Sequence, residues 1–240
     1  MKIEAGLMHF RELNEAVRTS GDTDIVIDRC TGQRYIADGL SGKKITINGT
    51  PGNALGAYMN GAEITLNGNA QEATGDTMND GAIYINGSAG DATGYAMRGG
   101  KIFVKGNVGY RAGIHMKAYR DKHPTLVVGG EAGSFLGEYQ AGGTVLVLGI
   151  DSRLAVPVGN FCGNGMHGGK IILRCKEAPA GLSEKIIVSA PSETDMEEIR
   201  LLTEEYCAHF GGSASELLKS DFIVLTADTK NPYKQLYTHN

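Results

Sequence analysis

A repeat of 19 residues runs through the middle of the chain, from Gly42 to Arg174, and it restricts the possible folds more than any other feature. Each row opens with a short apolar run, as in Gly61–Gly68 with the sequence GAEITLNG. Equivalent residues recur 19 positions apart, at Ile45, Ile64, Ile83 and Ile102 and again at Leu126 and Val145. Two longer steps, of 24 and 26 residues, are the same row with an insertion. A fixed period of this length is the signature of a solenoid.

Three further columns repeat with the same period. One holds methionine in most rows and comprises Met59, Met78, Met97, Met116, Gln140 and Met166. A glycine column three residues earlier comprises Gly56, Gly75, Gly94, Gly113, Gly137 and Gly163. An apolar column comprises Ile47, Leu66, Ile85, Val104, Val128, Val147 and Leu173. Gly-rich sequence is often a disordered linker, but a linker has no reason to keep such columns.

These columns predict an all-β fold, a right-handed parallel β-helix built from Gly-rich rows. A run of four or five apolar residues is too short to form a core alone. When rows stack about 4.8 Å apart and pair in parallel, equivalent residues form ladders. Isoleucine and valine then fill the interior, methionine fills the irregular space at a corner, and glycine adopts backbone angles that other residues avoid. We therefore expect Met78 to be buried.

Additions at both ends are expected to cover the terminal rows of this solenoid, so that residues 1–240 form one domain. Residues 1–22 are an N-terminal cap with a helix over 10–18, residues 23–178 are the β-helix, and residues 179–240 are a small α/β C-terminal cap and tail. Ser192–Asp195 begins a second helix with a capping box, and Gly211–Gly212 ends it. Phe222–Leu225 is expected to be a strand, and the tail Asn231–Tyr237 is expected to be extended.

The composition argues against several classes of function. The formal net charge is −4, which does not favour nucleic acid as a partner. The sequence contains no run of 18 apolar residues, so it predicts no membrane-spanning helix. The first residues, Met1–Ala5, include an acid and no long apolar core, unlike a signal peptide. We therefore expect a cytoplasmic protein that binds neither nucleic acid nor membrane.

No motif in the chain predicts catalysis, a cofactor site or a metal site. The Gly-x-Ser-x-Gly turn of hydrolases and the phosphate-binding Gly-x-x-x-x-Gly-Lys-Ser/Thr loop are both missing. Zinc and iron–sulfur sites need clustered ligands, and the cysteines are scattered at Cys30, Cys162, Cys175 and Cys207. His115 and His167 flank the methionine column, where a hydrogen-bonded histidine is the simpler interpretation. We therefore predict no catalytic, cofactor-binding or metal-binding residue.

The insertion after Met116 is the most charged break in the repeat. Our candidate interface consists of Tyr119, Arg120, Asp121, Lys122 and His123. Insertions in solenoids project as loops, often on the binding face. We expect this loop to contact a partner chain or a second copy of this chain. A surface loop without a partner is the alternative.

The row over residues 128–149, with the sequence VGGEAGSFLGEYQAGGTVLVLG, is the most distinctive stretch of the chain. Its Gly-Glu-Tyr-x-x-Gly-Gly core resembles the signature of the C-terminal GXGXG β-helix domain of the large subunit of glutamate synthase. Gly163–Gly169 resembles the closing row of that domain. Gly32–Ile36 and the end of the chain, 231–237, are similar to its stand-alone form, in which the synthase is split into separate chains. One component of formylmethanofuran dehydrogenase is a related β-helix.

The resemblance implies a non-catalytic structural subunit that positions the glutaminase and flavin-bearing synthase components of a split glutamate synthase. FMN and an iron–sulfur cluster are then expected in partner chains, with none in this chain. The glutaminase of this family uses an N-terminal cysteine, whereas this sequence begins Met1-Lys2. Two alternatives stay open: a scaffold subunit of a molybdenum or tungsten formylmethanofuran dehydrogenase-type complex, and an independent enzyme that uses a groove on the solenoid.

Overall fold

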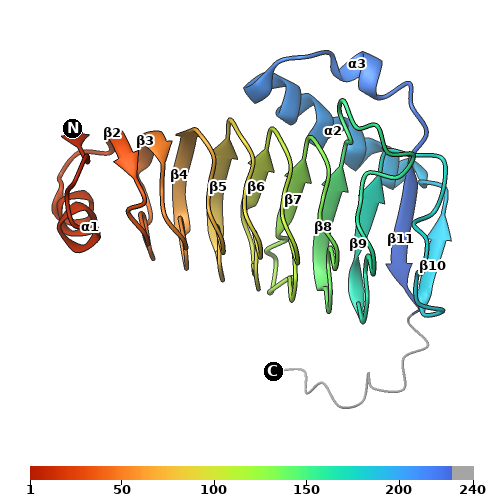
Figure 1. Cartoon of the computed structure of the whole chain (residues 1–240). Coiled ribbons are helices and arrows are strands. Elements are labelled where there is room, and N and C mark those ends of the chain that lie inside the picture. The colour runs from red at the N-terminus through yellow and green to blue at the C-terminus, as the bar shows by residue number, and fades with distance from the viewer. Residues whose placement is uncertain (229–240) are drawn as a thin grey trace.

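The apolar runs of the repeat form the strands of one large, open sheet, and the chain is predominantly β (Figure 1). The computed structural model describes residues 1–228. In that range the sheet has 11 strands, in the order β1-β2-β3-β4-β5-β6-β7-β8-β9-β11-β10. The first strands along the chain are β1 Lys2–Glu4, β2 Asp24–Thr31, β3 Lys44–Thr50, β4 Asn60–Asn67, β5 Asp80–Ile85, β6 Lys101–Val104, β7 Thr125–Val128, β8 Ala141–Val147 and β9 Gly168–Leu173.

The remaining elements lie at the two ends of the sequence. Helix α1, Phe10–Thr19, follows β1 and packs at the N-terminal end of the sheet. After β9 come β10 Ile186–Ser189, helix α2 Glu193–Phe210, the short helix α3 Ala214–Leu217 and β11 Ile223–Ala227. The tail Asn231–Tyr237, which the sequence predicts to be extended, lies outside the described residues.

The register of the sheet is the repeat itself. Strands β2 to β9 pair in parallel, and each strand pairs with the next at equivalent positions of the repeat. One ladder runs through Ile25, Ile45, Ile64, Ile83, Ile102, Leu126, Val145 and Ile171. The expectation that identical columns pair in parallel is therefore confirmed. Strand β11 then pairs antiparallel with β9, and β10 pairs antiparallel with β11.

The turn segments between the strands also contact one another from row to row. The glycine column donates a backbone hydrogen bond to the row before it, as from Gly75 N to Leu55 O (2.8 Å) and from Gly94 N to Thr74 O (2.7 Å). Glycine is needed where the chain turns into a strand. At Gly81 φ is +99°, and a Cβ atom there would collide with the backbone oxygen of Ala62. Each row therefore contributes both a strand and a turn segment to the same stack.

The methionine column is inside the stack, as the sequence predicts. Met59, Met78, Met97 and Met116 have no exposed surface. Gln140, which replaces methionine in the fifth row of this column, is equally buried, and its Nε2 donates to the backbone oxygens of Gly142 (3.3 Å) and Gly143 (3.0 Å). A buried amide needs such partners, and here they fix the start of β8.

Within the predicted C-terminal cap, β11 and β10 extend the end of the sheet, and helix α2 lies across its outer side (Figure 1). A second core forms there between outward-facing side chains of β5 to β9 and the apolar side of α2. It contains Tyr84, Phe103, Val127, Leu146, Leu148, Ile172, Ile199, Leu202, Tyr206, Phe222 and Val224. The predicted capping box is present, since Ser192 Oγ accepts from Asp195 N, and Gly211 ends the helix. Strands β1 and β10 have no counterpart in the sequence-based prediction.

Candidate interaction surfaces

The candidate interface Tyr119–His123 is a tight turn that folds back along the sheet. Tyr119 and Lys122 exchange two backbone hydrogen bonds of 3.1 and 3.0 Å. Arg120 sits at the tip with φ +57°, and its guanidinium carbon lies 5.1 Å from the centre of the Tyr119 ring. Tyr119, Arg120, Asp121 and His123 are exposed. The turn thus presents two rings and two charges to solvent.

Lys122 and His123 tie this turn to earlier and later rows. Lys122 Nζ lies 3.0 Å from Asp80 Oδ2 and 3.3 Å from Asn60 Oδ1, and its hydrogen bond lowers the pKa of Asp80. His123 Nε2 lies 3.2 Å from Thr144 Oγ1, which donates to Glu198 Oε1 of α2 at 2.6 Å. We expected a projecting loop; the structure shows an anchored one whose outer side remains exposed.

A groove of about 410 Å³ separates this turn from the C-terminal half of α2. Glu205 is its central group: its carboxylate accepts from Tyr84 Oη (3.1 Å) and from Lys101 Nζ (2.7 Å). His209 stacks on Tyr84 with ring centres 3.5 Å apart. Burial, and then the nearby Glu205 charge, raise the pKa of Tyr84 far above its usual value. These polar groups therefore satisfy one another, and Glu205 links α2 to β5 and β6.

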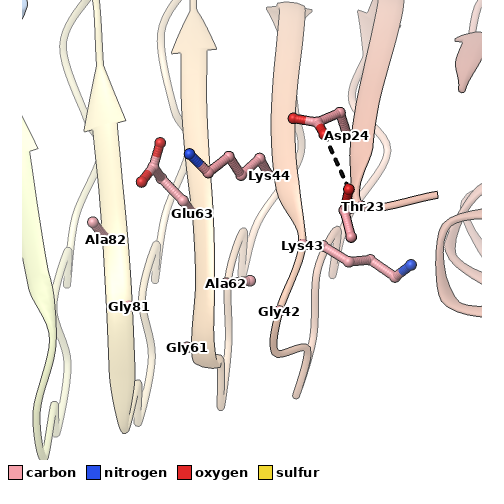
Figure 2. A pocket seen from close by; sticks show the side chains of 10 residues that line it. All are labelled: Thr23, Asp24, Gly42, Lys43, Lys44, Gly61, Ala62, Glu63, Gly81 and Ala82. Carbon is pink, nitrogen blue, oxygen red and sulfur yellow. Dashed lines mark hydrogen bonds between the residues drawn. The ribbon is translucent and has the colours of Figure 1, made fainter.

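A second, shallow groove of about 510 Å³ crosses the outer side of β2 to β5 (Figure 2). Lys44 extends from β3 towards Glu63 on the neighbouring β4, and Thr23 Oγ1 donates to Asp24 Oδ2 at 3.0 Å. Lys43 Nζ turns away and donates to the backbone oxygens of Ser20 and Asp22. Alternating charges on open β-strands are an ordinary solvated surface.

The sequence predicts no metal or catalytic residue, and the described residues contain no group of three or more His, Cys, Asp or Glu side chains arranged to hold a metal ion. Burial raises the pKa of the Cys30 thiol to about 11 and that of Cys162 to about 12. Such thiols are poor nucleophiles, because the thiolate is the reactive form. No helix of residues 1–228 is long and apolar enough to cross a membrane.

An exposed aromatic surface on the turn segments of the later rows was missed from the sequence. We call it the aromatic face, and it consists of the exposed residues Tyr110, Arg111, His115, Tyr139 and Phe161 and the half-buried Phe135. The ring centre of Phe135 lies 5.2 Å from that of Tyr110 and 4.8 Å from that of Phe161. His115 stacks on Tyr139 at 5.2 Å.

The aromatic face stands on backbone positions that disfavour large side chains. Arg111, His115, Phe135, Tyr139 and Phe161 all have φ between +53° and +62°. A non-glycine residue in this region costs roughly 1–2 kcal/mol. The equivalent positions in earlier rows have the same backbone but mostly small side chains, among them Ala54, Ala73, Ala92, Thr77 and Ala96. A switch from small to large side chains along these two columns is the sequence signal that could have revealed this face, although Tyr35 and Tyr58 in the first rows depart from it.

Parallel rows with a Gly-rich period define the class of protein, and comparison with known families agrees. A family model described as the GXGXG motif matches residues 12–227, and the chain belongs to this family. An uncharacterized protein of Methanocaldococcus jannaschii is 45% identical over 249 residues, which cover 98% of this chain and 95% of that protein.

Among solved structures, the chain resembles one chain of the formyltransferase/hydrolase complex (FhcABCD) from Methylorubrum extorquens, determined in complex with methylofuran. The TM-score is 0.63 at 22% sequence identity, and the match covers 88% of this chain and 76% of that chain. At this level of identity the likeness concerns the fold.

Proposed function

We propose that this chain is the non-catalytic structural subunit of a split glutamate synthase-like complex. The observation that carries the proposal is the distinctive row around Gly137–Gly143, whose sequence resembles the glutamate synthase signature. In the structure Gln140 of this row fixes β8, while Glu138 and Tyr139 help to build the aromatic face. These residues of the signature therefore support the stack and its surface, which agrees with a structural role.

The body suited to this role is a right-handed parallel β-helix forming one domain. Two observations support this finer description of the open sheet. The turn segments carry their own ladder of backbone hydrogen bonds, and a second parallel column of bridges joins Ala89, Val108, Ala132 and Val158. A body paired on more than one side resists bending. It can therefore hold two partner sites at a fixed distance, which is worth much in rate when one site releases ammonia and another consumes it.

The partners in this proposal are a glutaminase chain and a flavin-bearing synthase chain, which would carry the FMN and the iron–sulfur cluster. A second candidate function is favoured by the likeness to a chain of the formyltransferase/hydrolase complex: a scaffold subunit of a formyl-transferring or formylmethanofuran dehydrogenase-type assembly. In both candidate functions the chain holds its partners at a fixed distance, and only the partners differ.

Affinity purification of the tagged chain from its native cells, with identification of each stoichiometric partner, distinguishes the candidates. We expect a flavoprotein and a glutaminase. A pterin- or formyl-transferring subunit would establish the second candidate. A chain that purifies alone and turns over a small substrate would contradict both and support an independent enzyme.

A further inference from the structure

The aromatic face is distinguished by an arginine that packs against two neighbouring rings. The guanidinium carbon of Arg111 lies 5.0 Å from the centre of the Tyr110 ring and 5.6 Å from that of Phe135. Its side chain is 47% exposed. Cation–π contacts with both rings attract the guanidinium to this place. The two rings thus hold it at the surface.

A buried carboxylate lies beneath this arginine. The side chain of Glu138 is only 6% exposed, and its Oε2 lies 3.1 Å from Arg111 Nε. That contact lacks hydrogen-bond geometry, and Oε2 has no hydrogen-bond partner among the described residues. Oε1 has only a long contact of 3.4 Å from Asn164 Nδ2. A buried charge is costly unless it is well paired, so this pair is incompletely satisfied in the isolated chain.

Within residues 1–228 Arg111 contacts the two rings, and its Nε contacts Glu138. Its two terminal nitrogens make no hydrogen bond in that range. An arginine fork whose terminal nitrogens are free of hydrogen bonds can bind a carboxylate through two parallel hydrogen bonds. The rings around it offer apolar contact. Arginine and tyrosine are also among the residues most enriched at the energetic centres of protein interfaces.

We propose that the aromatic face is the docking site for a partner chain of the assembly, which presents an aspartate or glutamate to Arg111 and apolar side chains to the rings of Tyr139 and Phe161. Glu138 acts as a positioning residue that orients Arg111. The inference rests on the proposed function and deepens it, because it names the surface through which this subunit holds a partner. Covering the face also excludes water from the Arg111–Glu138 pair and strengthens it.

Binding of the purified flavin-bearing synthase chain and of the purified glutaminase chain to the immobilised full-length protein tests this inference. Arg111→Lys keeps the charge but loses the planar fork, and we expect it to raise the Kd for one of the two chains at least tenfold. Phe161→Ala removes a ring that is 51% exposed, with an expected rise of about fivefold. Tyr58→Ala is the matched control: it is 54% exposed with φ +54°, on an early row, and should leave the Kd within about twofold.

Circular dichroism melts should show the wild-type transition for Phe161→Ala and Tyr58→Ala, which are exposed, and a cooperative, at most slightly lowered transition for Arg111→Lys, which keeps a cation beside Glu138. Unchanged affinity of Arg111→Lys and Phe161→Ala for both chains, with binding by the wild type intact, would overturn this inference and leave the proposed function standing. A wild-type dimer that these variants abolish would assign the face to a second copy and also overturn it. A wild-type protein that binds neither chain would overturn the proposed function as well.

Discussion

The outer side of the sheet differs sharply between its early and late strands. One outward-facing ladder runs through Val26, Thr46, Thr65, Tyr84, Phe103, Val127, Leu146 and Ile172. Its first three members are partly exposed, and the last four have no exposed surface because α2 lies over them. The neighbouring inward-facing ladder, from Ile27 to Leu173, is fully buried in every row.

The interior and outer columns of the same repeat are therefore under different constraints. The interior column must be apolar in every row, because it packs against the rows on either side. Apart from Val26, the residues of the outer column are apolar only where another element covers them, so their composition indicates which part of the stack is covered. Helix α2 adds a polar clamp along the same late strands, where Lys170 Nζ lies 2.5 Å from Asp195 Oδ1 and 2.7 Å from Glu198 Oε2.

The largest loss of stability is expected inside the stack, where early and late rows are equally buried. Met78→Asp places a carboxylate at a site without exposed surface, and a buried unpaired charge costs several kcal/mol. We expect loss of the folded state or a very large fall in the denaturation midpoint, measured by chemical unfolding. A variant with nearly wild-type stability would show that the methionine column does not fill the interior.

On the outer ladder the two regions should respond differently to the same change. Phe103→Ala, beneath α2, is expected to lower the free energy of unfolding by about 3–5 kcal/mol, because it leaves a cavity. Thr65→Ala, at the equivalent position on the uncovered side, should change it by no more than about 1 kcal/mol. Guanidinium unfolding of both variants checks this. Equal losses would mean that α2 does not create a second core.

The clamp between α2 and β9 predicts a dependence on acid. Burial alone would raise the pKa of Asp195, but hydrogen bonds from Lys170 and Ser192 outweigh it and lower the pKa to about 2. A depressed carboxyl pKa stabilises the fold above the unfolded value of about 4 and loses that contribution as the pH falls towards 2. The contribution is on the order of 2 kcal/mol at most.

Stability measured from pH 6 to pH 2 should therefore fall less steeply in Asp195→Asn than in the wild type. Asp28→Asn is the matched control on the early strands, since Asp28 pairs with the exposed Lys2. Its effect on the acid slope should be smaller. Superimposable profiles for Asp195→Asn and the wild type would contradict the clamp.

The smallest effect on stability is expected at the insertion. Replacing both Arg120 and Lys122 by alanine removes an exposed ring contact and an exposed ion pair with Asp80, and surface changes of this kind rarely exceed about 1 kcal/mol. We still expect weaker complex formation, measured by titration with the partner chains. Unchanged affinity together with unchanged stability would leave the turn Tyr119–His123 as a simple surface loop.

The sequence predicts the interior of this molecule well and its outside poorly, for a physical reason. The positions of Met78 and Ile83 follow from the period, since stacking forces equivalent residues into one environment. The burial of Phe103 and Leu146 beneath α2 does not follow from the period, because α2 is distant in sequence and the repeat does not specify where it packs. The anchoring of Lys122 on Asp80, and the position of Glu138 beneath Arg111, depend likewise on turns whose direction no periodicity specifies.

The central claim is that the chain positions two catalytic partners without reacting itself. Its most direct test combines the purified glutaminase and flavin-bearing synthase chains with and without this chain, and measures glutamate formation from glutamine and from ammonia separately. We expect this chain to raise the glutamine-dependent rate far more than the ammonia-dependent rate, because only the former requires transfer between sites. Equal glutamine-dependent rates with and without the chain, or hydrolysis of glutamine by the chain alone, would contradict the claim.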